Sequence, residues 1–183
     1  ELEQRTTLQE LYDAATADGK HLFLEIGSGS CLSPLETAVH AANRVVFAVD
    51  HAFQPRERYF RKDLTPAASE KGSFAVFFGL DATTLDEKLK FERVQMVFPN
   101  PETHDELAGS VSRYVQHGVD LVILVDPFLH GEPGVEDIVR AIPADFTADA
   151  RTLRWSQIQG LLGIGDTEFK DHDRTTVIVA KRR

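Results

Sequence analysis

Glycines and acidic residues lie close together in the N-terminal third of this chain. Gly27 and Gly29 are separated by one residue, Glu25 precedes them, and Asp50 follows about 20 residues after Gly29. Glycine lets a backbone approach a ligand closely, and a helix that starts after such a turn presents free N–H groups to an anion. An acid at the end of the next strand can accept hydrogen bonds from ribose hydroxyls. The pattern indicates a nucleotide site, although a tight turn followed by a helix cap would use the same residues.

The spacing of the glycines distinguishes between kinds of nucleotide. A dinucleotide-binding turn requires a third glycine, which in this register falls on Leu32. The pattern therefore disfavours nicotinamide or flavin binding, and redox chemistry with a nicotinamide is only a minor alternative.

The segment Glu25-Ile26-Gly27-Ser28-Gly29 resembles motif I of the class I, Rossmann-like S-adenosylmethionine-dependent methyltransferases, which reads Glu/Asp-x-Gly-x-Gly. In that family the acid helps to hold the ammonium end of the methionine moiety, and the turn backbone lies against the cofactor. A third glycine that is common in the family is Cys31 here.

The resemblance continues at two further expected strand ends. Asp50 matches the ribose-binding acid of the family, and Asp81, in Gly79-Leu80-Asp81-Ala82, matches the acid that contacts the adenine amino group. An aspartate after a strand is often only a turn or cap residue, so each acid alone also has a structural interpretation. The resemblance implies S-adenosylmethionine as cofactor, bound by Glu25, Gly27, Gly29, Asp50 and Asp81.

The next expected strand, Val94 to Phe98, runs into Phe98-Pro99-Asn100-Pro101. Ligands of open parallel sheets bind beyond the carboxyl ends of the strands, so this segment should face the transferable methyl group. Methyl transfer from a sulfonium depends chiefly on alignment, for which prolines provide a stiff loop. Asn100 and Pro101 are therefore the candidate catalytic residues, with Asn100 hydrogen-bonded to the acceptor. A simple strand-ending turn is the other interpretation.

At the same segment the chain resembles the tRNA guanine-N7 methyltransferases, whose fourth strand ends in Phe-Pro-Asp-Pro before a tryptophan and a basic run. Asn100 replaces the acid of that motif, and residues 102–106 are Glu-Thr-His-Asp-Glu in place of the basic run. Residues 167–169 lie where that family has a guanine-binding motif, but Lys170 stands where the glutamate of that motif belongs. This resemblance implies the fold and the cofactor, and it does not extend to a tRNA substrate.

A short basic and aromatic segment could contact an anionic acceptor. It contains Arg56, Arg58, Tyr59, Phe60, Arg61 and Lys62. Such a segment can hold a phosphate or stack on a base. A solvated surface loop is the favoured interpretation, because the chain as a whole has a formal net charge of −9.

The amino-acid composition limits the cellular location and the classes of partner that we expect for this chain. The net charge of −9 repels polyanions at long range, and Cys31, the one cysteine among 183 residues, excludes an internal disulfide. The seven histidines lack the paired spacing of metal ligands, so we expect no metal. The apolar runs are too short to span a bilayer, so we expect no membrane partner and a cytoplasmic protein.

Expected helices alternate with expected strands. The helices are Thr7 to Ala17, segments starting at Ser33 and Thr65, Thr84 to about Lys90, Thr103 to Tyr114, Val135 to Ile142 and Trp155 to Leu162. The strands are His21 to Ile26, Val45 to Val49, Phe74 to Phe78, Val94 to Phe98, Val119 to Val125 and Thr175 to Ala180, with an extended segment near Glu168.

Continuously apolar strands of this kind are typical of a parallel sheet that is covered on both faces. The sequence therefore predicts one α/β, doubly wound domain over residues 1–183 with a mostly parallel sheet. The methyltransferase resemblance further implies that the final strand, Thr175 to Ala180, runs antiparallel beside Val119 to Val125.

Two functions remain open. The leading one is methyl transfer to a nitrogen or oxygen of a small molecule or an RNA base, which the acids Glu25, Asp50 and Asp81 favour. The alternative is a non-catalytic, methyltransferase-like binding or regulatory domain of a larger protein. The altered segment around Asn100 favours this alternative, as does a chain that begins with Glu1 rather than methionine.

Overall fold

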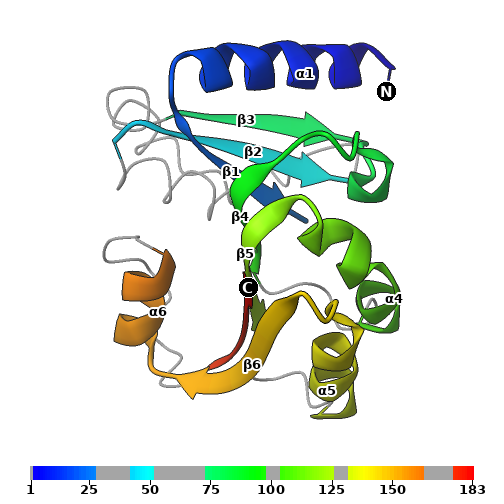
Figure 1. Ribbon diagram of the computed structural model, residues 1–183, viewed down its shortest axis with the longest axis vertical. Coiled ribbons are helices and arrows are strands. Elements are labelled where there is room, and N and C mark those ends of the chain that lie inside the picture. The colour runs from blue at the N-terminus through cyan, green and yellow to red at the C-terminus, as the bar shows by residue number, and fades with distance from the viewer. Residues whose placement is uncertain (1, 28–41, 52–72, 98–103, 126–131, 163–174) are drawn as a thin grey trace, which may run out of the picture.

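The computed structural model describes residues 2–27, 42–51, 73–97, 104–125, 132–162 and 175–183 (Figure 1). The described elements are α1 (Leu2–Ala17), β1 (His21–Ile26), β2 (Arg44–Asp50), β3 (Ser73–Phe78), the 3-10 helix η2 (Ala82–Thr84), β4 (Phe91–Val97), α4 (His104–Val115), β5 (Gly118–Val125), α5 (Glu132–Ala141), β6 (Phe146–Leu153), α6 (Trp155–Leu162) and β7 (Thr175–Arg182). The helices expected from Ser33 and Thr65 and the extended segment near Glu168 lie outside the described residues.

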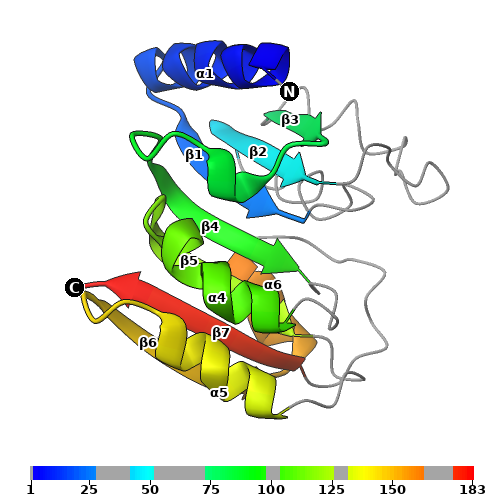
Figure 2. The same ribbon diagram turned by 90° about the vertical axis from the view of Figure 1, so that its right-hand side faces the viewer.

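The strands form one seven-stranded sheet in the order β3-β2-β1-β4-β5-β7-β6. The first five strands in this order pair in parallel, whereas β7 is antiparallel to both β5 and β6 (Figure 2). The expected α/β fold with a mostly parallel sheet and a reversed final strand beside β5 is therefore confirmed.

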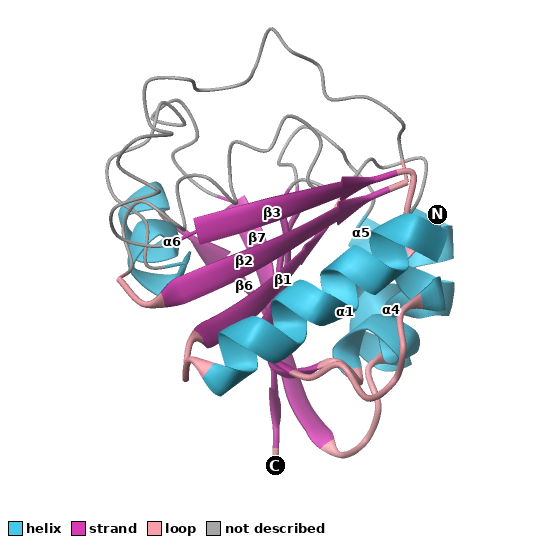
Figure 3. Cartoon of the chain, turned by 90° about the horizontal axis from the view of Figure 1, so that it is seen from above, coloured by secondary structure: helices cyan, strands magenta, loops and turns pink. Residues whose placement is uncertain are grey.

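Helices cover both faces of this sheet. Buried side chains of α1, α4 and α5 join one apolar cluster with the strands, while Trp155 and Ile158 of α6 belong to a second cluster with β5 and β7. Figure 3 shows α6 on the opposite side of the sheet from α1 and α4. Because both faces are covered, a central strand such as β2 is buried from its second residue to its last.

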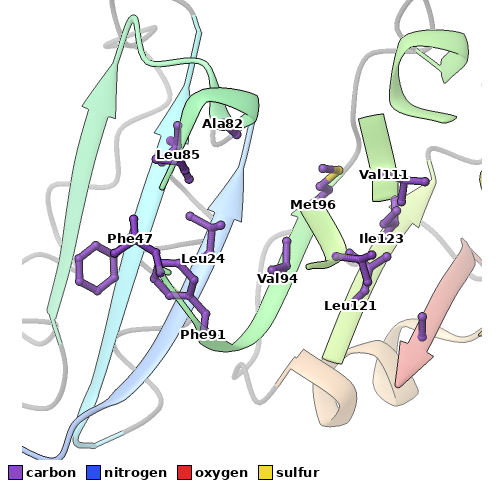
Figure 4. Packing of buried hydrophobic residues seen from close by; sticks show 14 of the residues in the cluster. Leu24, Phe47, Ala82, Leu85, Phe91, Val94, Met96, Val111, Leu121 and Ile123 are labelled. Carbon is purple, nitrogen blue, oxygen red and sulfur yellow. The ribbon is translucent and has the colours of Figure 1, made fainter. Parts of the chain in front are cut away.

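An aromatic group fixes α1 against the sheet. The rings of Phe47 and Phe91 lie 5.5 Å apart at 62°, and Tyr12 lies 5.5 Å from Phe91 at 73°. The Tyr12 hydroxyl also donates a 2.8 Å hydrogen bond to the carbonyl oxygen of Lys90, just before β4. Figure 4 shows Phe47 and Phe91 beside Leu24 in the interior. Edge-to-face packing and this hydrogen bond together hold α1 to β2 and β4.

The helix expected over Thr84 to Lys90 is wrong. The chain forms the short η2 helix and then turns, although Leu85 and Leu89 are buried at helical spacing. Side chains satisfy the backbone here, because Asp86 Oδ1 accepts a 2.9 Å hydrogen bond from the Lys88 N–H. Short polar side chains compete in this way with the hydrogen bonds of a helix.

Strand β6 was not expected from the sequence. Most of its residues are exposed, and as an edge strand it pairs with β7 alone. A strand with so little burial lacks the apolar pattern by which strands are recognised in a sequence.

Among the described residues, no helix combines the length and the apolar character needed to cross a membrane.

Candidate functional site

The order of the strands defines a place where a ligand can bind. From β1 the sheet continues to β2 and β3 on one side and to β4 and β5 on the other. Such a reversal of strand order opens a crevice at the carboxyl ends of the two strands that flank it, here β1 and β4. The residues at and just before these ends are therefore the candidate site.

Glu25 lies inside the sheet near the end of β1. It is 1% exposed, and its strand neighbour on β4 is Gln95, which is 0% exposed. Gln95 Nε2 donates a 2.6 Å hydrogen bond to Glu25 Oε2. A buried carboxylate is costly unless it accepts such bonds, so Gln95 stabilises Glu25 in this position.

Gln95 was missed at the sequence level. It is a polar residue among the apolar residues Val94, Met96 and Val97 in the second half of β4, which is the available signal that it has a special role. Its partner could not be identified from the sequence, because Glu25 is 70 residues away along the chain.

Gly27 makes the turn that follows β1. Its N–H donates a 2.8 Å hydrogen bond to the carbonyl oxygen of Val49, and its φ of +71° favours glycine over any other residue. Apart from the two chain neighbours of Gly27, no atom of the described residues lies within 4 Å of a Cβ built on this glycine. On this side, the described residues leave the backbone open to the approach of a ligand. Gly29 lies outside the described residues.

Asp50 ends β2 at the same edge of the sheet. Its side chain is largely buried, since the residue is 6% exposed, and Oδ1 lies 3.9 Å from Nδ1 of the exposed His51. A carboxylate at a strand end that is mostly shielded from water suits hydrogen bonds to a ligand's hydroxyl groups.

Asp81 follows β3, the strand beside β2. It is exposed, and its Oδ1 accepts a 2.9 Å hydrogen bond from the Thr83 N–H at the start of η2. The structure therefore gives Asp81 the role of a cap residue. Asp81 also comes three residues after Phe78, the last residue of β3, which is the strand neighbour of Asp50 at the carboxyl edge of the sheet.

Two arginines lie closer to the amino ends of the strands: Arg93 is two residues before Gln95 on β4, and Arg44 is the first residue of β2. The guanidinium carbons of Arg44 and Arg93 lie 4.1 and 5.4 Å from the centre of the Phe23 ring. Burial lowers the pKa of both guanidinium groups, and Arg93 also donates a 2.7 Å hydrogen bond to the carbonyl oxygen of Leu161 in α6. Phe23 and Glu25 alternate with Leu24 on β1, so this stack and Glu25 share one face of the sheet.

The candidate catalytic residues Asn100 and Pro101 lie outside the described residues, a few positions after the end of β4 at Val97. Within the described ranges there is also no group of three or more histidine, cysteine, aspartate or glutamate side chains that could hold a metal ion. The described part of the candidate site thus consists of Glu25, Gly27, Asp50, Asp81 and the additional residue Gln95.

Neither a family model nor a curated protein matches this chain by sequence. Solved structures do match. The 16S rRNA (adenine(1408)-N(1))-methyltransferase from Catenulisporales acidiphilia has a TM-score of 0.65 at 15% identity, over 94% of this chain and 92% of its own. The 16S rRNA methyltransferase KamB has a TM-score of 0.61 at 15% identity, over 90% and 89%. The antibiotic-resistance methyltransferase Kmr has a TM-score of 0.58 at 18% identity, over 93% and 90%.

At these identities the similarity shows the fold, which is that of the class I methyltransferases. The antiparallel β7 is part of that similarity and is foreign to an ordinary dinucleotide-binding sheet.

Proposed function

We propose that this chain transfers a methyl group from S-adenosylmethionine to a nitrogen or oxygen of a small molecule or an RNA base. The observation that carries the proposal is the position of two buried acids, Glu25 and Asp50, at the carboxyl edge where the strand order of a class I methyltransferase fold reverses. Charged residues are uncommon in a protein interior, and the position of these two at the ligand-binding edge of the sheet points to a ligand.

The described residues fit the cofactor in three respects. The described residues leave space next to the Cα of Gly27, so the backbone can lie against the ligand. The buried carboxylates of Glu25 and Asp50 can accept hydrogen bonds from an ammonium group and from ribose hydroxyls. One carboxylate oxygen of Asp81 caps η2, and the second is a hydrogen-bond acceptor of the kind that the adenine amino group requires.

In this proposal the cofactor supplies a methyl group on a sulfonium, which is electrophilic without help from a metal. The protein's task is to bind and align the two reactants, which can contribute several kcal/mol to lowering the barrier. Asn100, held between Pro99 and Pro101, would orient the acceptor through its side-chain amide. A nitrogen nucleophile does not require a strong general base for this reaction.

Two observations bear on the acceptor. The structural neighbours named above include a 16S rRNA (adenine(1408)-N(1))-methyltransferase. The net charge of −9 opposes an RNA acceptor unless a local basic segment, such as residues 56–62, contacts it. A small molecule and an RNA base are therefore both proposed as acceptors, and the methyl-transfer assay distinguishes them.

Calorimetric titration tests the cofactor first. We expect S-adenosylmethionine and S-adenosylhomocysteine to bind and NAD to show no heat of binding. Binding of NAD alone would overturn the proposal in favour of redox chemistry.

Methyl transfer to a panel of small amines, phenols and RNA tests the reaction itself. Turnover on a small amine or phenol supports the small-molecule reading. Transfer to RNA that weakens with salt and with Arg58→Ala supports an RNA acceptor. Cofactor binding without turnover on any acceptor would identify a non-catalytic binding or regulatory domain.

A further inference from the structure

We infer that Gln95 determines recognition of the amino-acid end of the cofactor, by positioning the Glu25 carboxylate and by offering its own amide oxygen to the ammonium group. The inference rests on the proposed function and deepens it, because it adds a residue from β4 to the cofactor-binding residues, which the sequence placed at the ends of β1, β2 and β3.

The first argument is position. Glu25 and Gln95 are strand neighbours on β1 and β4, the two strands that flank the reversal of strand order. Each lies within two residues of the end of its strand, since β1 ends at Ile26 and β4 at Val97. The hydrogen-bonded pair therefore bridges the base of the crevice in which ligands of such sheets bind.

The second argument is an unsatisfied acceptor. Gln95 Nε2 is used by Glu25, while Gln95 Oε1 is buried and has no hydrogen-bond partner among the described residues. A buried polar atom without a partner destabilises a fold. Gln95 Oε1 is one of seven such side-chain atoms among the described residues, and it is the one on the residue that pairs with Glu25. In the proposed site, the ammonium group of the cofactor would supply the missing donor.

The third argument is chemical complementarity. The pair presents a carboxylate and an amide oxygen next to each other, and both of them only accept hydrogen bonds. The ligand group that matches two adjacent acceptors, one of them charged, is a cation with several N–H donors. An ammonium group has three donors and one positive charge, and in the proposed cofactor it belongs to the amino-acid end.

A purely structural role is the competing explanation. In that case Gln95 would serve only to satisfy Glu25 inside the sheet, and replacing it would lower stability and weaken every ligand of the site alike. Ligands that share the adenosine part and differ in the amino-acid part separate the two explanations.

The experiment titrates the wild type and Gln95→Met with S-adenosylhomocysteine and with 5′-methylthioadenosine, which lacks the ammonium group. Methionine keeps the size of glutamine and removes both amide functions. We expect Gln95→Met to weaken S-adenosylhomocysteine by about tenfold or more and to leave 5′-methylthioadenosine within about twofold. Thermal unfolding of both proteins is measured in parallel.

Gln9→Met is the matched control. Gln9 Nε2 also donates a hydrogen bond to a carboxylate, Asp13 Oδ1, at 2.8 Å, but both residues lie on α1. We expect this variant to bind both ligands as the wild type does.

An equal loss for both ligands, or no loss for either, would overturn the inference. Should Gln95→Met fail to fold, the wild type alone provides the test. The wild type should bind S-adenosylhomocysteine at least about tenfold more tightly than a desamino analogue, in which hydrogen replaces the amino group. Equal affinities for these two ligands would overturn the inference. If the wild type binds none of these ligands, the proposed function itself fails, a result distinct from equal losses in the variant.

Discussion

The backbone N–H of Leu80 donates a 3.2 Å hydrogen bond to the carbonyl oxygen of Asp50. This bond ties the end of β2 to the turn after β3, in which Gly79 has a φ of +69° and Asp81 caps η2. The two acids assigned to the ribose and the adenine are thus held at one edge by backbone contacts. Substitutions of either side chain leave this hydrogen bond in place, so they test the carboxylates alone.

Replacing Asp50 by alanine should weaken S-adenosylmethionine by about tenfold or more, because a hydrogen bond to a charged group contributes about 1.5–3 kcal/mol. Calorimetric titration measures the change. Asp149→Ala is the control, since Asp149 is an exposed aspartate on β6 that pairs with Arg151 at 2.7 Å. Unchanged affinity in Asp50→Ala would make Asp50 a turn residue only.

Two substitutions of Asp81 separate its cap role from its proposed contact with adenine. Asp81→Ala removes both and should lower the free energy of unfolding by about 0.5–2 kcal/mol, the range for losing a helix cap. Asp81→Ser keeps a cap oxygen, so its unfolding should resemble that of the wild type while cofactor affinity falls. Urea unfolding and calorimetry measure the two effects. Wild-type affinity in both variants would remove Asp81 from the site.

Asn100→Ala should lower kcat more than it lowers cofactor affinity. An interaction used to align the acceptor acts in the transition state and contributes little to binding of the cofactor beforehand. The measurement pairs methyl-transfer kinetics, on whichever acceptor is active, with cofactor titration. A variant that loses cofactor affinity and turnover in equal proportion would assign Asn100 to cofactor binding instead.

Phe47→Ala should destabilise the protein by about 3–5 kcal/mol, the range for removing a large buried aromatic side chain. Phe47 is fully buried and contacts the rings of both Tyr12 and Phe91, so the cavity would separate α1 from β2 and β4. Urea unfolding measures the loss. Val119→Ala is the control, because Val119 is exposed on β5 and should change stability by less than about 0.5 kcal/mol.

Stability should fall as the pH is lowered below about 6.5, in part because of His117. Its ring is buried and its Nδ1 donates a 2.9 Å hydrogen bond to the Leu89 carbonyl oxygen, and desolvation lowers its pKa. Between the folded-state pKa and about 6.5, the unfolded chain therefore binds more protons than the folded one, so the free energy of unfolding rises with pH. The contribution of His117 to stability is fully present above about pH 6.5 and is lost as the pH falls through this range.

Urea unfolding of the wild type and His117→Gln at about pH 7.5 and about pH 5.5, on either side of the ordinary histidine pKa, checks this prediction. The variant should lose less stability between the two values than the wild type does. An equal loss in both proteins would mean that His117 does not contribute.

The sequence by itself determined those strands and helices whose burial leaves a local apolar pattern. The strands β1, β2 and β5 read as apolar runs, and α6 was expected from Trp155 to Leu162 as observed, because burial of a face leaves a local pattern. The glycine turn and the acids Glu25, Asp50 and Asp81 were also visible, since each follows or precedes an expected strand end.

Tertiary structure decided what local pattern does not contain. The edge strand β6 exists because β7 supplies its hydrogen bonds, and the segment from Leu85 to Leu89 turns although its two leucines have helical spacing. Above all, only the pairing of β1 with β4 places Gln95 beside Glu25. The neighbour of a residue across a sheet depends on how the chain crosses over and packs, and these long-range contacts leave no periodicity in the sequence.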